Sequence, residues 1–347
     1  MSISLGFGLI TCQRYPGDQR SDAQIYAEAL DLAEQAETLG LDSVWVSEHH
    51  FVDDGYAPSM LPLCAAIAAR TRRVQIGTGL LLAPLHDPIR LAEDAAVTDL
   101  LSGGRLTLGF GLGWRAEEFA GLGIPLDERV PRLVASLGIL RDAWRGDLVS
   151  GGAGRPAVPV RPRPARPGGP PLWIGANSKR AIRRAGRLAD GFMATEVTPG
   201  QLAEQASWAR EEFAAAGRTG QFTVSMHLPV FAWHSPDAWP LIRDYHRYID
   251  WKYEDMERGW ARAAEPSAPP PLRGEEESVL RESIILGTPE QVAGTIDEYR
   301  RKVGGDLVFI ARLYFPGLPA DIQAEALRIF ANEVAPLARD LAGDDGG

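Results

Sequence analysis

A regular alternation of short apolar strands and amphipathic helices constrains the fold of this 347-residue chain more than any other sequence feature. Eight segments have the β-branched, aromatic or apolar character of strands. They begin near residues 3, 43, 74, 105, 171, 190, 222 and 306. Because helical patterns lie between them, the sequence predicts an α/β protein with the architecture of a (β/α)8 barrel, or TIM barrel.

A doubly wound open sheet is the alternative fold. Its dinucleotide-binding fingerprint, G-x-G-x-x-G, is missing from the turn after the first strand. The sequence GFGLGW at 109–114 imitates the fingerprint, but Trp114 stands where the third glycine belongs. The barrel is therefore the preferred prediction.

Two segments interrupt the alternation. Residues 147–171 are crowded with glycine and proline and cannot form a helix. Residues 235–286 contain an aromatic helical pattern followed by a proline-rich, acidic stretch. We predict one barrel domain over residues 1–347, with insertions at about 147–171 and 235–286. We expect 239–286 to cover the substrate side as a mobile lid, with Tyr245, Tyr248 and Trp251 partly facing in. A surface helix docked on the barrel is the alternative.

Composition and charge argue against several classes of protein. The formal net charge is −10 and the basic residues are scattered, so we expect no nucleic-acid partner. The sequence has no basic leader and no long apolar run, so we expect neither a signal peptide nor a membrane span. Two cysteines, Cys12 and Cys64, are too few for a disulfide scaffold or a zinc site, and they favour a cytoplasmic protein without a metal.

The stretch LDSVWVSEHHF, residues 41–51, begins as a buried strand and ends in Glu48, His49 and His50. Barrel enzymes place their chemistry at the carboxyl ends of the strands. Successive strand residues point to opposite faces, so the two histidines cannot both face one pocket. We take His49 as the catalytic candidate, with Glu48 and His50 in supporting roles. The alternative is a solvated strand end without function.

Other predicted strand ends also carry polar residues. They include Cys12, His86, Glu196, His227 and Arg312. The sequence contains no carboxylate pair of the glycosidase type, no cluster with metal-ligand spacing and no G-x-S-x-G elbow.

The sequence IGANSKRAI contains the best candidate for an anion site. A strand ends at Gly175, and Asn177 and Ser178 can cap the following helix, whose N-terminus attracts anions. Lys179 and Arg180 add positive charge and indicate a phosphate. An ordinary helix start with solvated basic side chains is the alternative.

The glycine-rich turn at 109–114 is a second ligand candidate. Gly111 gives the backbone room for a flat ligand to approach closely. Small residues that only improve packing in a barrel strand are the alternative.

Several motifs, in this order along the chain, resemble the bacterial luciferase-like flavin-dependent monooxygenases. They are SEHHF at 47–51, IGTGLLLAPLHDPIRLAEDAAVTDLLSGGRLTLGFGLGW at 76–114, EEFAGLGI at 117–124, the IGANS…ADGF block at 174–192 and TPEQVAGTIDEYRRKVGGDLVF at 288–309. The resemblance covers most of the chain and implies a (β/α)8 barrel. It also implies reduced FMN, usually supplied by a separate flavin reductase, or the deazaflavin F420. The Glu-His-His form resembles the FMN-using branch, so FMN is the expected cofactor and F420 the alternative.

The resemblance also implies roles for individual residues. His49 matches the family's catalytic histidine, and Gly79 and Leu80 flank its non-proline cis peptide behind the flavin ring. The segment from Asn177 to Arg180 would lie at the phosphate. Phe110 stands where luciferase itself has a reactive cysteine, so light emission is not expected.

We therefore expect a cytoplasmic flavin-dependent monooxygenase that uses reduced FMN and O2 to oxidise a small, hydrophobic organic substrate. The expected partners are that substrate, a flavin reductase and a second copy of the chain in a homodimer. The alternatives are F420-dependent hydride transfer and a non-catalytic flavin-binding relative.

Overall fold

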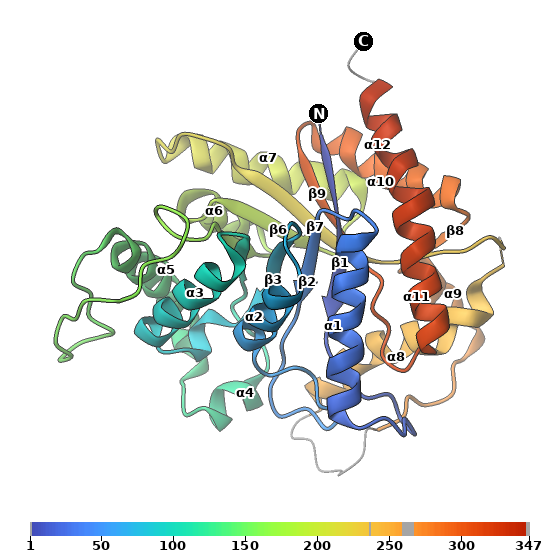
Figure 1. Cartoon of the computed structure of the whole chain (residues 1–347), viewed down its shortest axis with the longest axis horizontal. Coiled ribbons are helices and arrows are strands. Elements are labelled where there is room, and N and C mark those ends of the chain that lie inside the picture. The colour runs from blue at the N-terminus through green and yellow to red at the C-terminus, as the bar shows by residue number, and fades with distance from the viewer. Residues whose placement is uncertain (1, 236, 259–266, 345–347) are drawn as a thin grey trace.

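Eight parallel strands form a closed barrel in the computed structural model, which describes residues 2–235, 237–258 and 267–344 (Figure 1). The barrel strands are β1 (Ile3–Ile10), β2 (Ser43–Val46), β3 (Gln75–Leu81), β4 (Leu106–Phe110), β5 (Leu172–Gly175), β6 (Gly191–Thr195), β7 (Thr223–Ala232) and β9 (Leu307–Arg312). Strands β1 to β7 pair in sequence order, and β9 closes the ring by pairing with both β7 and β1. The predicted (β/α)8 fold and all eight predicted strands are confirmed.

Helices surround the barrel, and the residues that precede them explain where several begin. The surrounding helices are α1 (Asp22–Thr38), α2 (Met60–Arg70), α3 (Pro88–Ser102), α5 (Arg129–Arg145), α6 (Lys179–Leu188), α7 (Pro199–Ala215), α10 (Pro289–Val303), α11 (Ala320–Ile329) and α12 (Ala335–Asp344). Ser21, Thr198 and Thr288 each form a capping box with the glutamine three residues later. Among the described residues, no helix combines the length and the apolar character needed to cross a membrane.

The lower part of the barrel interior is filled by side chains. Trp45 stacks on Trp173 with ring centroids 5.2 Å apart, and both belong to a buried cluster with Leu9, Met193 and Ile310. The space for Trp45 comes from small neighbours, because a Cβ atom on Gly77 would lie 2.2 Å from its ring. Above this packed layer, a cavity opens toward the carboxyl ends of the strands.

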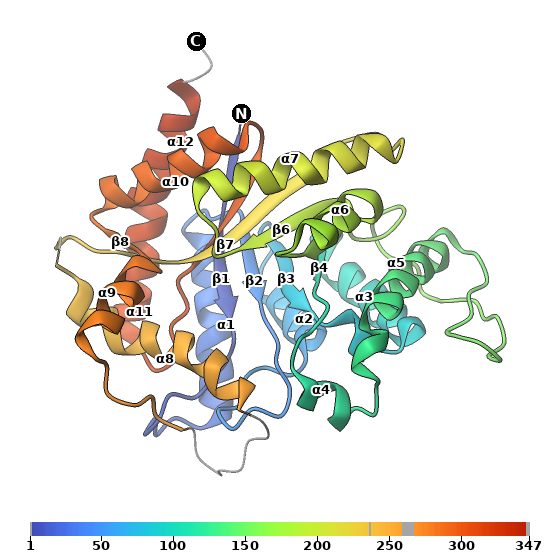
Figure 2. The ribbon, with the colours of Figure 1, turned by 180° about the vertical axis from the view of Figure 1, so that it is seen from behind.

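Two helices lie at the end of the barrel where the strands finish. Figure 2 shows α4 (Ala116–Gly121) and α8 (Trp239–Glu257) at the side of the molecule opposite the N-terminus, from which β1 runs inward. Residues 147–171 contain no helix, as predicted, and Val149 pairs with Val158 in an isolated bridge. The segment 235–286, of which 236 and 259–266 lie outside the described residues, contains α8 and α9 (Gly274–Glu282).

The sequence did not predict α9 or a short additional strand. The proline-rich, acidic stretch gave no helix signal, but α9 begins within it at Gly274, with three glutamates in its first turn, where negative charge is favourable. Strand β8 (Ile285–Gly287) pairs with the end of β7, outside the closed ring. Three residues are too few to show a strand pattern in the sequence.

Candidate active site

A cavity of about 710 Å³ opens at the carboxyl ends of the barrel strands. Most of the predicted site residues line it, namely Glu48, His49, Gly79, Leu80, Gly111, Gly175, Asn177 and Ser178. His50, Lys179 and Arg180 are not among the lining residues. The fold therefore brings the candidate catalytic histidine and the candidate flavin-binding segments to one place.

His49 is held by a carboxylate from α4. Its Nδ1 lies 2.8 Å from Oε1 of Glu118, and the same oxygen accepts the backbone N–H of His50 at 2.9 Å. The Glu118 side chain is 0% exposed and that of His49 is 7% exposed. Because Nδ1 is engaged, Nε2 is the ring nitrogen of His49 left for a ligand in the cavity.

The environment of Glu118 favours its ionised form. Burial alone raises the pKa of this carboxyl. The hydrogen bond and charge of His49, together with the His50 N–H, outweigh burial and leave the pKa below its ordinary value. An ionised Glu118 fixes the orientation of the His49 ring.

Glu118 was missed when the sequence was interpreted. The only signal was its place in EEFAGLGI, a motif that we used for the resemblance and to which we gave no chemical role. The helix α4 is six residues long and lies far along the chain from His49. Without the fold, nothing in the sequence pairs these two side chains.

Glu48 and His50 take different positions beside His49. The Glu48 carboxylate accepts the backbone N–H of Leu82 at 2.6 Å, and it thereby ties the end of β2 to the turn after β3. The His50 side chain lies outside the cavity, and its burial lowers its pKa despite the nearby carboxylates of Glu48 and Glu118. Of the two histidines, His49 is the one that faces the cavity.

Glycines and Leu80 form an apolar floor in the cavity. The Gly79–Leu80 peptide is cis, which confirms that implication of the family resemblance. A Cβ atom on Gly175 would lie 2.0 Å from Leu80 Cδ1, and one on Gly111 would lie 3.2 Å from Leu80 Cβ. Because both glycines lack a Cβ atom, the Leu80 side chain can lie between the ends of β4 and β5. The resulting surface suits a flat ring such as a flavin.

The start of α6 is at the edge of the same cavity. Ser178 caps the helix by accepting the Ala181 N–H at 3.4 Å, and the first N–H groups of a helix have no partner within it. These groups and the helix dipole suit a phosphate. Lys179 instead lies over the ring of Trp208, 4.4 Å from its centroid, and Arg180 is exposed. The site therefore fits a flavin phosphate through backbone groups, Asn177 and Ser178.

The opposite wall, formed by β7, β9 and α8, carries a second set of polar side chains. His227 Nε2 lies 3.2 Å from Thr195 Oγ1, and burial together with the charge of Arg312 lowers its pKa to about 3. His246 Nε2 lies 2.8 Å from Ser283 Oγ, and the same two causes lower its pKa to about 4. Both histidines are therefore neutral near pH 7.

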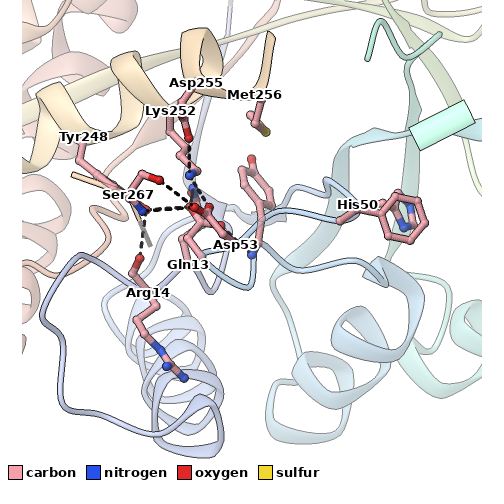
Figure 3. A network of polar contacts seen from close by, with 12 residues as sticks. Gln13, Arg14, His50, Asp53, Tyr248, Lys252, Asp255, Met256 and Ser267 are labelled. Carbon is pink, nitrogen blue, oxygen red and sulfur yellow. Dashed lines mark hydrogen bonds and ion pairs between the residues drawn. The ribbon is translucent and has the colours of Figure 1, made fainter. Parts of the chain in front are cut away.

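Helix α8 covers this wall and is fixed to the loop after β2. Lys252, whose side chain is 1% exposed, bonds to Asp53 and lies 2.8 Å from Asp255 Oδ2. Figure 3 shows Lys252 reaching from α8 toward Asp53, with Ser267 beside the same carboxylate. Arg115, which immediately precedes α4, also contacts α8, because its Nε donates to the Met256 carbonyl at 3.3 Å.

The side chains of α8 that face the cavity are not the ones that we predicted. The expectation for Tyr245, Tyr248 and Trp251 was wrong, because the lining residues of this helix are His246, Ile249, Asp250, Tyr253 and Glu257. These five follow helical spacing along one stripe. Tyr248 lies on the neighbouring stripe and donates its hydroxyl to Asp54 at 2.9 Å, so it belongs to the contact with the loop after β2.

Within the described ranges, no group of three or more His, Cys, Asp or Glu side chains has the arrangement of a metal site.

Comparison with known proteins identifies relatives across the whole barrel. Residues 5–306 match the family model described as luciferase-like monooxygenase. The oxygenase component of a flavin-dependent trigonelline monooxygenase from Acinetobacter baylyi is 31% identical over 174 residues, 49% of this chain and 48% of that protein. The chain thus spans about half the length of several curated relatives that it matches.

Other matches extend over nearly the full length. An F420-dependent glucose-6-phosphate dehydrogenase from Kineococcus radiotolerans is 30% identical over 330 residues, 89% of this chain and 92% of that protein. The crystal structure of the monooxygenase RslO1 from Streptomyces bottropensis superimposes with a TM-score of 0.77 at 25% identity, covering 97% of this chain and 99% of that one.

Proposed function

Because the chain belongs to the luciferase-like monooxygenase family, we propose that it is a flavin-dependent monooxygenase that oxidises a small organic substrate with reduced FMN and O2. One observation carries the proposal. A histidine oriented by a buried carboxylate, His49 with Glu118, faces a cavity that has an apolar floor and a helix N-terminus at its edge. The family resemblance of the Glu-His-His sequence favours FMN.

The residues of the cavity would hold the cofactor in two ways. Leu80, Gly111 and Gly175 would support the ring, while Asn177, Ser178 and the first turn of α6 would hold the phosphate. When bound, reduced FMN supplies the electrons that activate O2.

His49 would hold and transfer the proton that the reaction needs. Its Nε2 faces the cavity while Glu118 holds Nδ1, so the ring can take or give a proton at one defined atom. Glu118 keeps the ring in one orientation during both transfers. Other acid–base sites likewise use a histidine that transfers the proton and a carboxylate that orients the histidine.

Helix α8 would exclude water from the reacting groups. Ile249 and Tyr253 present their side chains to the cavity, and Lys252 fixes the helix above it. Exclusion of water strengthens electrostatic interactions and protects reactive species from side reactions.

F420-dependent hydride transfer is the second candidate function. The observation that favours it is the 30% identity to an F420-dependent glucose-6-phosphate dehydrogenase over 92% of that protein. Both functions use a flavin-like ring over an apolar floor, and both need a nearby proton donor or acceptor. They differ in the requirement for O2.

We also propose the remaining features that the sequence analysis predicts. The chain would form one barrel domain with insertions at about 147–171 and 235–286, act as a cytoplasmic homodimer, and receive its reduced flavin from a separate reductase. The trigonelline enzyme is the oxygenase component of its monooxygenase, which supports the last point by analogy.

A binding titration tests the proposal. The protein is titrated with FMN and with F420, each in oxidised and reduced form under anaerobic conditions, and ligand fluorescence or heat is recorded. The proposal predicts that reduced FMN binds more tightly than either form of F420. Tighter binding of F420 would favour the dehydrogenase function instead.

A further inference from the structure

Arg312 points into the barrel mouth from the last residue of β9. Alternate residues of a strand face the same side, and Val308 and Ile310 pack in the inner cluster with Trp45 and Trp173. Arg312 therefore lies on the same inward-facing side of β9, where it lines the cavity. The residue is only 2% exposed.

The guanidinium of Arg312 lacks the partners that a buried cation normally has. Its Nε and Nη2 are buried and make no hydrogen bond within the described part of the chain. Lys252, by contrast, contacts two carboxylates, and Arg300 Nη2 lies 2.7 Å from Asp297 Oδ1. Among the residues that the structure describes, no carboxylate forms an ion pair with Arg312 within 4.0 Å.

The groups around Arg312 stabilise its charge without forming an ion pair with it. Burial lowers the pKa of Arg312, but the nearby Tyr253, Tyr56 and Glu196 outweigh burial and leave the pKa above its ordinary value. His227 and His246 are neutral near pH 7, and the Tyr253 ring lies 5.9 Å from the guanidinium carbon. Two carboxyl groups, Glu196 and Asp250, also line the cavity. Neither carboxylate forms an ion pair with Arg312 within 4.0 Å in the described part of the chain, although the charge of Glu196 acts on Arg312 from a greater distance. Because no carboxylate of the described residues contacts the guanidinium, its Nε and Nη2 remain available to a ligand.

Charge and geometry together indicate the class of that ligand. Leaving a charge buried without a partner is costly, and an anion arriving in the cavity removes that cost. Nε and Nη2 form one edge of the guanidinium and donate in parallel, which matches the two oxygens of a carboxylate. We propose that Arg312 binds the carboxylate of the substrate, so that the substrate is an organic acid with an apolar body. This inference rests on the proposed function, which makes the cavity a substrate site.

The position of Arg312 separates the substrate anion from the cofactor phosphate. The start of α6 follows β5, whereas Arg312 ends β9, and strands β6 and β7 lie between them in the ring. Tyr253 lies between Arg312 and the catalytic candidate, because its ring centroid is 5.6 Å from that of His49. An acid anchored on Arg312 would extend past Tyr253 toward His49 and the flavin floor.

Calorimetric titration with matched probes tests the inference. The probes are acetate and acetamide, benzoate and benzamide, and decanoate and decanamide, which differ within each pair mainly in the carboxylate. The wild-type protein loaded with FMN should prefer the acid in at least one pair. Arg312→Met should weaken that acid about tenfold or more and leave the amide unchanged. No acid preference in any pair, or equal affinities in wild type and variant, would overturn the inference.

Two further measurements separate ligand binding from other roles of Arg312. The ligand-free Arg312→Met variant should keep or raise the thermal midpoint, because the charge it removes forms no ion pair with a described residue; a large fall would identify a structural arginine and overturn the inference. FMN affinity should not change, and a parallel loss of FMN would assign Arg312 to the flavin. If Arg312→Met does not fold, Arg312→Lys replaces it: the charge remains but the fork is lost, so the acid should weaken and the amide should not. Unchanged acid affinity there would equally overturn the inference.

These titrations need no turnover, so their result is independent of the proposed reaction. A protein that binds acids through Arg312 but consumes no O2 with reduced FMN would refute the proposed function alone. An active flavin monooxygenase that shows no preference for acids would refute only the role of Arg312.

Discussion

Glu118 and Arg312 are both buried charged residues beside the same cavity, yet their surroundings differ. Glu118 accepts from His49 and from the backbone of His50, and its charge is compensated within the protein. Arg312 makes no ion pair with any described residue, and its neighbours His227 and His246 are neutral. Glu118 Oε2 is also buried without a hydrogen bond among the described residues, but the Glu118 carboxylate contacts the His49 ring, whereas the Arg312 guanidinium contacts no described carboxylate.

This difference teaches which parts of the cavity are independent of the substrate. The side formed by β2 to β5 and α4 contains the oriented histidine, the glycine-lined floor and the start of α6, all of which suit the cofactor and proton transfer. The side formed by β7, β9 and α8 contains the arginine without an ion pair among the described residues and suits the substrate. Substitutions on the two sides should therefore affect different measurements.

The largest effect is expected for His49. Removing a general acid–base group costs roughly 10² to 10⁴ in rate, so His49→Ala should lose product formation by about that factor while it still folds and binds reduced FMN. Reduced FMN should then reduce O2 to hydrogen peroxide instead of supporting product formation. His50→Ala is the control, since His50 lies outside the cavity. Stopped-flow spectra with product analysis would decide, and a normal product yield from His49→Ala with loss in His50→Ala would show that the wrong histidine was assigned.

A large effect on stability is expected for Lys252, which fixes the cover of the substrate side. Lys252→Met leaves the buried Asp53 carboxylate without its cation, and removing one partner of a buried ion pair costs about 3–5 kcal/mol. Urea unfolding would measure this loss, and hydrogen exchange should increase in α8. Lys302→Met, on an exposed side chain, is the matched control. Equal stabilities of the two variants would contradict the role of Lys252.

The mobility of residues 239–286 remains a prediction. Hydrogen exchange of α8 measured with and without ligand tests it.

A smaller effect of pH is expected from the neutral histidines of the substrate side. The folded pKa values of His227 and His246, about 3 and about 4, lie below the ordinary 6.5. The unfolded chain therefore binds more protons than the folded one below pH 6.5, and stability falls as the pH decreases toward those values. Each histidine should cost about 2 kcal/mol by pH 5.

Urea unfolding between pH 5 and pH 7 would test this pH effect. The double substitution His227→Gln with His246→Gln should flatten the dependence, whereas His234→Gln should not, because the His234 side chain is 62% exposed. An unchanged slope in the double variant would contradict the neutral state of the two buried histidines.

The smallest effect is expected at the phosphate end of the cofactor side. Ser178→Ala removes one hydroxyl beside the start of α6 and should weaken FMN by about tenfold or less, since one charge-assisted hydrogen bond contributes roughly 1.5 kcal/mol here. Riboflavin, which lacks the phosphate, should be unaffected. Thr198→Ala is the control, because Thr198 caps α7 in the same manner but does not line the cavity. Equal losses for FMN and riboflavin would place the phosphate elsewhere.

Much of the fold could be predicted because strands and caps have local signals. The eight barrel strands are short apolar runs, and residues such as Asp87 and Thr288 mark helix starts through their own side chains. The position of His49 followed from the end of a strand. In contrast, its pairing with Glu118 depends on a contact between residues 69 apart in the chain, and no local pattern reports such a contact.

The stripe of α8 that faces the cavity could not be predicted for a related reason. Aromatic residues occur on two adjacent stripes of this helix, of which one faces the cavity and the other packs against the loop after β2. The sequence shows that such a helix is amphipathic but not which partner each stripe meets. The ion pair between Lys252 and Asp53 fixes which stripe meets the loop after β2, and this pair forms only when the chain folds.

Incorporation of oxygen from ¹⁸O2 tests the central claim most directly. The enzyme is supplied with chemically reduced FMN, ¹⁸O2 and a mixture of organic acids from a metabolite extract, and the products are examined by mass spectrometry. The account predicts a product that carries one heavy oxygen atom, whose formation requires FMN and is lost in His49→Ala. A product that forms without O2, depends on F420 and contains no heavy oxygen would contradict it.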